Sequence, residues 1–321
     1  ALPISRPFDT FRITESGDVY TCCAAYVKYN KIGNIFENSA YDIWFGKAAE
    51  ELREKIKNGD YSMCDLKLCR SRSPVEISKV QNGCPFPKYV NLSYDKECNL
   101  NCITCRDEKY QNSEEKRAFY NDKMPALILP LLKEAEEISI SAYGEALYSK
   151  HSRELIKRIA QENKKVKFRI YTNGLLFNDG NLKALGIKNR VNEVFISLPA
   201  IDKTVYNKII RGSDYDTVIK NIKYSAENIP KVTINSVISI LNYKEIPKLA
   251  EFAKENNISL SISAFRYKGT IFGKDDKNVF VWEKENPEFC NLKEILKHPA
   301  LSYDRITMAP VFRKIIKMEQ V

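Results

Sequence analysis

Three cysteines within eight residues constrain this chain more than any other feature of its sequence. Cys98, Cys102 and Cys105 have the spacing C-x3-C-x2-C and directly follow the apolar run 89–94, which is typical of a buried strand. Three thiolates on one short loop can hold one face of an inorganic cluster. They cannot complete a structural zinc site or a four-cysteine iron–sulfur site unaided. The spacing therefore predicts a metal cluster at a strand end, with one metal position open to a substrate or cofactor.

The cysteine content indicates a reducing compartment. The chain has nine cysteines in 321 residues, and its first residues, Ala1 to Arg6, contain no apolar signal-peptide core. The longest apolar run, 124–132, is too short to span a bilayer. We therefore expect a cytoplasmic protein without membrane contact, in which thiols bind metal instead of forming disulfides. An incomplete zinc site and three unrelated buried cysteines remain the alternatives to a cluster.

The formal net charge of +10 points to an acidic partner. A nucleotide, a phosphorylated or carboxylated substrate, an acidic peptide and an acidic electron carrier all satisfy this condition. Nucleic acid is disfavoured, because no recognised nucleic-acid motif accompanies the lysines and many of them solvate helix faces. The sequence also lacks G-x-x-x-x-G-K-[ST], a strand-following G-x-G-x-x-G, and G-x-S-x-G. Their absence argues against a nucleotidase, a dehydrogenase or an esterase.

From residue 89 onward, strand-like and helix-like segments alternate. Apolar, β-branched runs occur at 89–94, 138–142, 167–172, 192–198, 232–240 and 258–265, and helical periodicities at about 113–133, 149–163, 214–228 and 245–256. Six such units predict a parallel, barrel-like α/β sheet with its chemistry at the C-terminal strand ends. The tail, 268–321, is less regular, with a helical stretch from Asn291 to His298. We expect it to cover the open side of the barrel.

A small cysteine-containing module precedes the barrel. Apolar positions on both sides of Ser16-Gly17-Asp18 predict a hairpin that turns at Gly17, and a helical stretch follows from Ala40 to Ile56. A turn-rich linker occupies 71–88. The candidate metal ligands of this region are Cys22, Cys23, Cys64, Cys69 and Cys84, of which four are expected to bind. Four sulfurs suit an iron–sulfur cluster and a zinc ribbon alike.

The C-x3-C-x2-C loop resembles the radical S-adenosylmethionine (SAM) superfamily. In that family the open iron of a [4Fe-4S] cluster chelates SAM, and one electron from the cluster releases a 5′-deoxyadenosyl radical. The N-terminal pattern looks like a SPASM or truncated "twitch" module, which holds an auxiliary iron–sulfur cluster; the pattern comprises Gly17-x4-Cys22, Gly33-Asn34-Ile35, Ile43-Trp44, Leu52-Arg53 and Cys64-x4-Cys69. The module usually follows the barrel, whereas here it comes first, as in some subgroups.

The resemblance implies a domain order. It comprises an α+β auxiliary-cluster module at 1–70, the linker at 71–88, a partial (β/α)6 TIM-like radical SAM barrel at 89–267 and the tail at 268–321. Relatives with this order often have a further cysteine near Pro7-Phe8, where this chain has Ile4 and Ser5. That departure leaves the fourth auxiliary ligand open between Cys23 and Cys84.

The resemblance also assigns strand-end residues to SAM. Tyr143-Gly144-Glu145 occupies the position of the family's GGE element, which holds the SAM ammonium, with Tyr143 replacing the first glycine. A glycine at a strand exit lets the backbone approach a ligand closely. The other positions are Thr172 and Asn173 in a TNG exit, Ser197 near the ribose, Arg211 at the carboxylate and Asn242 on the adenine side. A guanidinium suits a carboxylate, but turn chemistry or a solvated helix start is the alternative for the last three.

The function implied is that of a radical SAM oxidoreductase that receives electrons from an acidic flavodoxin- or ferredoxin-type donor. Such an enzyme positions the radical against one substrate C–H bond. The basic charge and compact size favour dehydrogenation or epimerisation of a saccharide or nucleotide-sugar. A peptide-modifying maturase and, in another class, a zinc-dependent nucleic-acid-binding protein are the alternatives.

Three residues outside the motifs complete the sequence-based expectations. Cys290 lies outside both cluster regions, so it is either the hydrogen-atom donor of an epimerase or a small buried apolar residue. His151 and His298 lie far from any motif and are expected at the surface or on helices.

Overall fold

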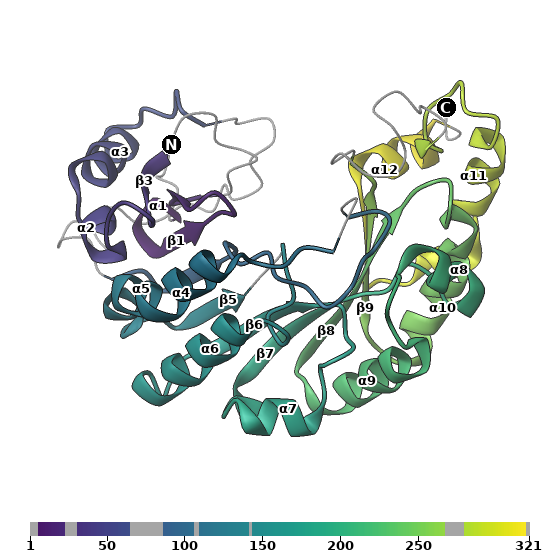
Figure 1. Ribbon diagram of the computed structural model, residues 1–321. Coiled ribbons are helices and arrows are strands. Elements are labelled where there is room, and N and C mark those ends of the chain that lie inside the picture. Colours follow the sequence, from purple (N-terminus) through teal and green to yellow (C-terminus); the bar gives the residue numbers. More distant parts are fainter. Residues whose placement is uncertain are drawn as a thin grey trace. The chain divides into compact units, whose positions relative to one another are not determined.

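The computed structural model describes residues 6–22, 31–64, 86–105, 109–140, 143–266 and 279–318. Two compact units are present (Figure 1): residues 1–97, 112–169 and 182–190 form the first, and residues 98–111, 170–181 and 191–321 form the second. One boundary between the units therefore falls between Glu97 and Cys98. Another falls inside strand β6 (Lys167–Thr172), which contributes residues to both units.

The sheet of the first unit combines the N-terminal module with the start of the α/β region. Its strand order is β3 (Lys31–Asn34), β2 (Asp18–Tyr20), β1 (Thr10–Ile13), β4 (Tyr89–Leu92) and β5 (Glu137–Ile140). The pairs β1–β2 and β2–β3 are antiparallel, whereas β1–β4 and β4–β5 are parallel. The predicted hairpin at Gly17 is confirmed. It adds β1 and β2 to the sheet next to β4, the strand that precedes the cysteine loop. Gly17 has φ +81°, a conformation that favours glycine.

Helices flank these strands. They are α1 (Arg6–Asp9), α2 (Ala40–Trp44), α3 (Lys47–Lys57), α4 (Glu114–Asp122), α5 (Met124–Leu132), α6 (Lys150–Glu162) and the 3₁₀ turn Lys188–Arg190, while α7 (Asp179–Ala184) spans the boundary between the units. Ser113 and Ser149 cap α4 and α6, each accepting a backbone N–H bond through its hydroxyl. These serines satisfy donors that the first helical turn leaves unpaired.

Two predicted helices are interrupted in the structure. The stretch Ala40–Ile56 divides into α2 and α3 at Gly46, where a Cβ atom would lie 2.5 Å from the carbonyl oxygen of Asp42. The stretch 113–133 divides at Lys123, directly before Met124-Pro125. Proline lacks an N–H group and favours the first turn of a new helix, which explains the second interruption.

The second unit contains a fully parallel sheet. Its strands, in order, are β7 (Val191–Ser197), β8 (Lys231–Ile238), β9 (Ser259–Ala264) and β10 (Ile306–Met308). The helical segments are α8 (Lys203–Ile209), α9 (Tyr215–Asn228), Tyr243–Glu245, α10 (Ile246–Glu255), α11 (Phe289–Ile295), Pro299–Ser302 and α12 (Pro310–Lys317). Helices α9 and α10 pack on β8 and β9 (Figure 1). Strand β10 lies in the tail and was not predicted.

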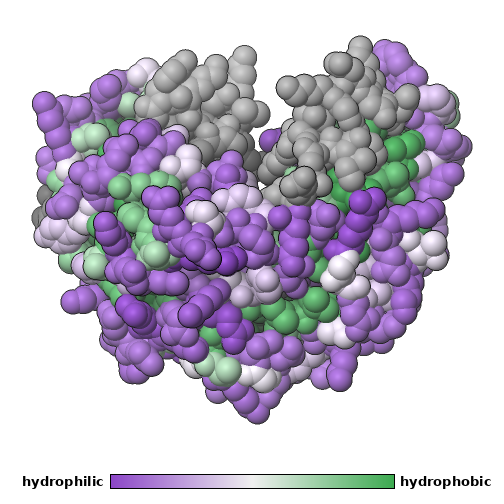
Figure 2. Space-filling view, in the orientation of Figure 1, coloured by the Kyte–Doolittle hydropathy of each residue, from purple (hydrophilic) through white to green (hydrophobic). Residues whose placement is uncertain are grey.

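The expected α/β class is confirmed, with mostly parallel strands and a small N-terminal module. All six predicted strands form close to their expected positions, as β4 to β9. The face of the molecule seen in Figure 2 is mostly hydrophilic, with smaller hydrophobic areas between the polar side chains. Within the described ranges, no helix has both the length and the apolar character needed to cross a membrane.

Candidate functional site

The cysteine loop, residues 98–105, is fixed by its backbone to the end of helix α8 and the segment that follows it. The N–H group of Asn101 donates to the carbonyl of Arg211 at 3.1 Å, and that of Ile103 donates to the carbonyl of Ile209 at 3.0 Å. These bonds do not involve the thiols. The loop and the predicted Arg211 position are therefore neighbours within the second unit.

Apolar side chains anchor the same loop, whose cysteines are at least partly exposed. Leu100 and Ile103 are buried, whereas Cys98 and Cys102 are half-buried and Cys105 is exposed. The N–H group of Leu100 donates to the sulfur of Cys98 at 3.5 Å. Hydrogen bonds to sulfur ligands stabilise the thiolate form and tune the potential of an iron–sulfur cluster.

The donor set on this loop fits a [4Fe-4S] cluster with one open iron. In the part of the chain that the structure describes, no three Cys, His, Asp or Glu side chains meet as the ligands of one metal ion. A four-iron cluster makes a different demand, because each thiolate holds a different iron. Three at least partly exposed cysteines with buried residues between them meet that demand, and they leave the fourth iron without a protein ligand from the loop.

The turn after β6 also contacts the cysteine loop. The side-chain nitrogen of Asn173 donates to the side-chain oxygen of Asn99 at 2.9 Å, and its own oxygen accepts the N–H bond of Leu175 at 3.1 Å. Gly174 has φ +83° and donates its N–H to the hydroxyl of buried Thr172 at 3.1 Å. The TNG exit is thus a tight turn, and its asparagine ties it to the loop.

In the first unit, Gly144 and Glu145 pack on the segment that leads to the cysteine loop. A Cβ atom at Gly144 would lie 2.6 Å from the carbonyl oxygen of Asp95 and 2.7 Å from that of Glu97, so only glycine fits. The N–H of Glu145 donates to the carbonyl of Glu97 at 2.8 Å. The Glu145 side chain is 1% exposed and accepts a bond from the N–H of Leu147. The neighbouring Tyr143 is half-buried.

The remaining residues predicted to contact SAM differ in their surroundings. Ser197, at the end of β7, and Arg211 are exposed. Asn242 is buried, and its amide nitrogen donates to the carbonyls of Pro199 and Val237 at 2.9 and 3.0 Å. One amide hydrogen therefore bonds β8 and the other bonds the segment after β7. The side-chain oxygen accepts the N–H of Ser239 in the turn after β8, as the turn-chemistry alternative predicts. A contact between Asn242 and adenine stays a prediction.

The structure covers part of the predicted auxiliary set. Cys22 follows β2, and Cys64 donates its N–H to the carbonyl of Tyr61 at 2.9 Å. The other three candidates, Cys23, Cys69 and Cys84, lie outside the described residues, as do 71–85 of the predicted linker and 268–278 of the predicted tail. Cys290 lies on α11 and is exposed, which excludes its interpretation as a buried apolar residue.

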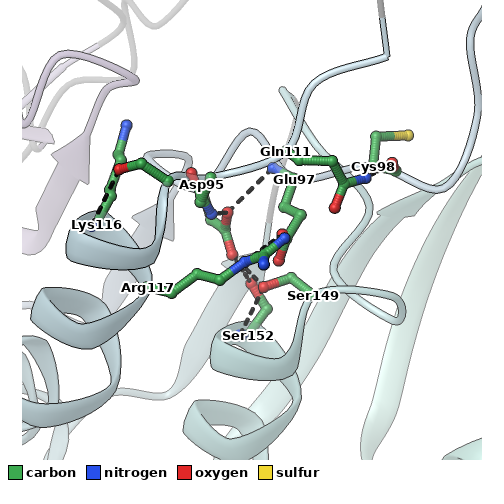
Figure 3. Close-up of polar contacts among 10 residues, drawn as sticks. Asp95, Glu97, Cys98, Gln111, Lys116, Arg117, Ser149 and Ser152 are labelled. Atoms are coloured by element: carbon green, nitrogen blue, oxygen red, sulfur yellow. Dashed lines mark hydrogen bonds and ion pairs between the residues drawn. The ribbon is translucent and has the colours of Figure 1, made fainter.

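Sequence reasoning missed two buried carboxylates directly before the cysteine loop (Figure 3). Asp95 and Glu97 are each 6% exposed. One Glu97 oxygen accepts bonds from Nε and Nη2 of Arg117 at 3.0 and 2.5 Å. Acidic side chains in a strand exit are usually solvated, and nothing in the local pattern indicates burial. Their position just before Cys98 was the one available signal.

His151 is on helix α6, as expected, but it is buried and not at the surface. It is 5% exposed, and its Nε2 atom lies 2.6 Å from the hydroxyl oxygen of Tyr94. Burial lowers the pKa of His151 to about 4, although the nearby charge of Asp95 acts in the opposite direction. Burial likewise raises the pKa of the Tyr94 hydroxyl. Both groups are therefore neutral at physiological pH.

The buried histidine makes stability depend on pH. Below pH 6.5 the unfolded chain protonates His151, but the folded chain does so only near its pKa of about 4. The unfolded state therefore binds more protons in this window, and the free energy of unfolding should fall by about 3 kcal/mol as the pH drops through it. Urea denaturation of the apoprotein between pH 7 and pH 4 measures the effect. A His151→Gln variant should lack this part of the pH dependence of the free energy of unfolding. If the variant shows the same pH profile as wild type, the dependence does not come from His151.

Family models match both the region that begins with the cysteine loop and the N-terminal module. Residues 96–253 match the radical SAM superfamily, and residues 5–70 match SPASM, described as an iron–sulfur cluster-binding domain. The first match begins two residues before Cys98. The second contains Cys22, Cys23, Cys64 and Cys69 but not Cys84. The module therefore precedes the radical SAM domain, as predicted.

Individual relatives match over about half of this chain. GTP 3′,8-cyclase of Clostridium perfringens (strain 13 / Type A) is 32% identical over 179 residues, or 54% of this chain and 53% of the cyclase. The tungsten-containing aldehyde ferredoxin oxidoreductase cofactor-modifying protein of Pyrococcus furiosus is 26% identical over 178 residues, or 51% and 48%. The chain thus spans about half the length of these curated relatives. Streptococcus suis SuiB bound to SAM aligns with TM-score 0.46 and 19% identity, over 93% of this chain and 71% of SuiB.

The two domain matches together cover more than two thirds of the chain. They support a [4Fe-4S] cluster and SAM as cofactors, in agreement with the three at least partly exposed cysteines of the loop. The chain therefore belongs to the radical SAM superfamily, as an iron–sulfur enzyme whose SPASM domain lies N-terminal to the radical SAM domain.

Proposed function

We propose that this enzyme abstracts a hydrogen atom from a saccharide or nucleotide-sugar, leading to dehydrogenation or epimerisation. When bound, the cluster and SAM supply a 5′-deoxyadenosyl radical, and an auxiliary cluster supplies a second redox centre. The residues of the chain bind and orient the reactants and exclude water. The observation that carries the substrate class is a row of neutral polar side chains across the sheet of the second unit.

This polar row crosses four parallel strands. Ser197 of β7 is in register with Asn235 of β8, Asn235 with Ser261 of β9, and Ser261 with Thr307 of β10. All four side chains are exposed or half-exposed, whereas the alternate residues of β7 to β9, such as Ile234, are buried on the opposite face. Adjacent strands lie about 4.8 Å apart. Each side chain can donate and accept hydrogen bonds, so the row suits a ligand with several hydroxyl groups.

An aromatic pair lies beside the polar row. The rings of Tyr171 and Phe195 stack with centroids 4.5 Å apart and an interplanar angle of 5°. Phe195 is in register with Thr233, which pairs with Ser259, so two further hydroxyl-bearing residues continue the row of Phe195. Both aromatic side chains are half-buried. Flat aromatic surface next to convergent polar groups is typical of sites that bind a ring-shaped polar ligand.

The strand-end residues are proposed to contact the cofactor, and the polar row beyond Ser197 the substrate. Tyr143, Gly144 and Glu145 are assigned to the SAM ammonium, Thr172 and Asn173 to the turn beside the cysteine loop, Ser197 to the ribose and Arg211 to the carboxylate. The substrate is then expected along Asn235, Ser261 and Thr307, which continue the row from Ser197. These three side chains carry no charge, so the net charge of +10 is assigned to recruiting an acidic flavodoxin- or ferredoxin-type electron donor.

Substrate-dependent SAM cleavage tests the proposed class. Anaerobically reconstituted protein is incubated with SAM, dithionite and either nucleotide-sugars or linear peptides. The 5′-deoxyadenosine formed above the substrate-free background is then measured, together with the product mass. Saccharides should stimulate cleavage. Stimulation by peptides alone would instead support the maturase alternative. The zinc and nucleic-acid alternative is set aside, because both domain matches are to iron–sulfur protein families.

Cys290 is proposed as the hydrogen-atom donor if the reaction is an epimerisation. Cys290 is exposed. A hydrogen-atom donor must reach the substrate radical and be regenerated after turnover, and an exposed residue is compatible with both. A Cys290→Ser variant should cleave SAM at the wild-type rate but incorporate no solvent deuterium into the product in D2O. Labelled product at the wild-type rate would exclude the donor role, and unlabelled wild-type product with two hydrogens lost would indicate dehydrogenation.

A further inference from the structure

The carboxylate of Asp95 is the centre of a buried hydrogen-bond network (Figure 3). Its Oδ1 atom accepts bonds from the side-chain nitrogen of Asn112 at 3.0 Å and from the N–H of Glu97 at 3.1 Å. Its Oδ2 atom accepts from the hydroxyl of Ser152 at 2.9 Å and from that of Ser149. Four donors around one buried carboxylate satisfy its hydrogen-bonding capacity, as a buried polar group requires.

Three of these donors come from two separate helical regions. Asn112 precedes α4, whereas Ser149 caps α6 and Ser152 lies in its first turn. Ser149 accepts the N–H bond of Ser152 while it donates its hydroxyl to Asp95. The positive end of the α6 dipole therefore also favours the carboxylate. Asp95 thus fixes the strand exit to the starts of both helices.

Glu97 fixes the other end of the same short segment. Its side chain forms the ion pair with Arg117 of α4, with Nη2 at 2.5 Å from Oε1. Its carbonyl accepts the N–H bond of Glu145 at 2.8 Å. Gly144 contacts the same segment, because a Cβ atom there would lie under 3 Å from the carbonyls of Asp95 and Glu97. Gly144 and Glu145 therefore pack directly against segment 95–97.

We propose that Asp95 is a positioning residue for SAM, which holds segment 95–97 so that Gly144 and Glu145 keep the placement needed to bind the SAM ammonium. This inference rests on the SAM role assigned above to those two residues. Asp95 itself contacts neither SAM nor the cluster in this proposal.

Asp95→Asn tests the proposal with minimal change in shape. The amide nitrogen that replaces Oδ2 cannot accept the two serine hydroxyl bonds, so segment 95–97 loses its attachment to α6. We expect iron and sulfide contents equal to wild type but a dissociation constant for SAM raised about tenfold. The matched control is Asp202→Asn, at the N-cap of α8. Asp202 accepts bonds from the N–H groups of Thr204 and Val205, and asparagine caps equally well. This control should bind SAM as wild type does.

Two further measurements separate positioning from simple loss of stability. In the apoprotein, hydrogen–deuterium exchange of the Glu145 amide should be faster in Asp95→Asn than in wild type, because that amide donates to Glu97. In a double-mutant cycle with Glu145→Gln, Asp95→Asn should change the SAM binding free energy by less than half of the change that it causes in the wild-type background. Residues that act through one another give non-additive effects.

The outcomes are distinguishable from one another. SAM affinity unchanged in Asp95→Asn, or equally reduced in both backgrounds, would overturn the positioning role even if the melting temperature falls. If Asp95→Asn does not fold, Ser152→Ala removes one donor and should raise the SAM dissociation constant about threefold; an unchanged constant would overturn the proposal. Wild-type protein that binds no SAM would instead refute the assigned SAM role. The exchange of the Glu145 amide tests the network without any cofactor.

Discussion

Replacing Cys98, Cys102 and Cys105 together with alanine is expected to abolish the formation of 5′-deoxyadenosine from SAM and dithionite. The three thiols are the metal ligands proposed for the open-iron cluster, and without them no iron is left to chelate SAM. The loop should keep its conformation. Its backbone bonds to Arg211 and Ile209 do not involve sulfur, and buried Leu100 and Ile103 anchor it.

Anaerobic chromatography of the reaction measures the nucleoside, and circular dichroism with thermal melting of the apoproteins checks the fold. Cys290→Ala is the matched control, since it removes a thiol outside both cluster regions and should leave the substrate-free cleavage of SAM unchanged. SAM cleavage by the triple variant at the wild-type rate would contradict the assignment of the cluster to this loop. Loss of cleavage in the Cys290 control would show that thiol removal alone is damaging.

The parallel α/β architecture was predictable because each of the strands β4 to β9 is buried on at least one face. The runs that became β7 and β8 are rich in β-branched residues, and their alternate positions, such as Val194 and Ile234, are buried. Such runs give a strong local signal. In contrast, β10 has only three residues, none of them buried, and it depends on pairing with β9. No local pattern could reveal it.

The points at which the helices break do not appear in the helical periodicity, because they follow from a close backbone contact and a proline. Helical periodicity continues on both sides of Gly46 and of Lys123, so a continuous helix was expected at each place. A close contact with the carbonyl of Asp42 requires the glycine, and Pro125 begins a new helix. In contrast, the N-terminal module joins the α/β sheet through the parallel pairing of β1 with β4, which is a long-range contact. Spacing alone does not encode it.

At the site, the residues that carry chemistry were easier to predict than those that hold them in place. Cys98, Cys102 and Cys105 are recognisable because metal binding requires particular residue types at a fixed spacing. The network around Asp95 uses ordinary Ser and Asn side chains that are up to 57 positions away in sequence. Only the fold brings them together. Asn242 illustrates the opposite case, since its position matched a family pattern while its amide nitrogen bonds the backbone carbonyls of Pro199 and Val237.

Reconstituted wild-type protein is expected to contain about eight iron and about eight sulfide per chain, because a second cluster should form in the SPASM domain. The triple variant of the cysteine loop should retain about four of each. The SPASM match spans four of the five candidate ligands and leaves Cys84 outside. Cys84→Ala should therefore keep the full iron content, whereas Cys22→Ala combined with Cys64→Ala should lose about half of it.

The double variant and the triple variant remove different clusters, so their spectra should differ as well. In the double variant the cluster that remains should still respond to SAM in its electron paramagnetic resonance spectrum, because the open iron is on the cysteine loop. In the triple variant the remaining cluster should not respond. Wild-type protein with about four iron, all lost in the triple variant, would mean that the N-terminal cysteines bind zinc or no metal. Elemental analysis for zinc in the same sample decides between those two possibilities.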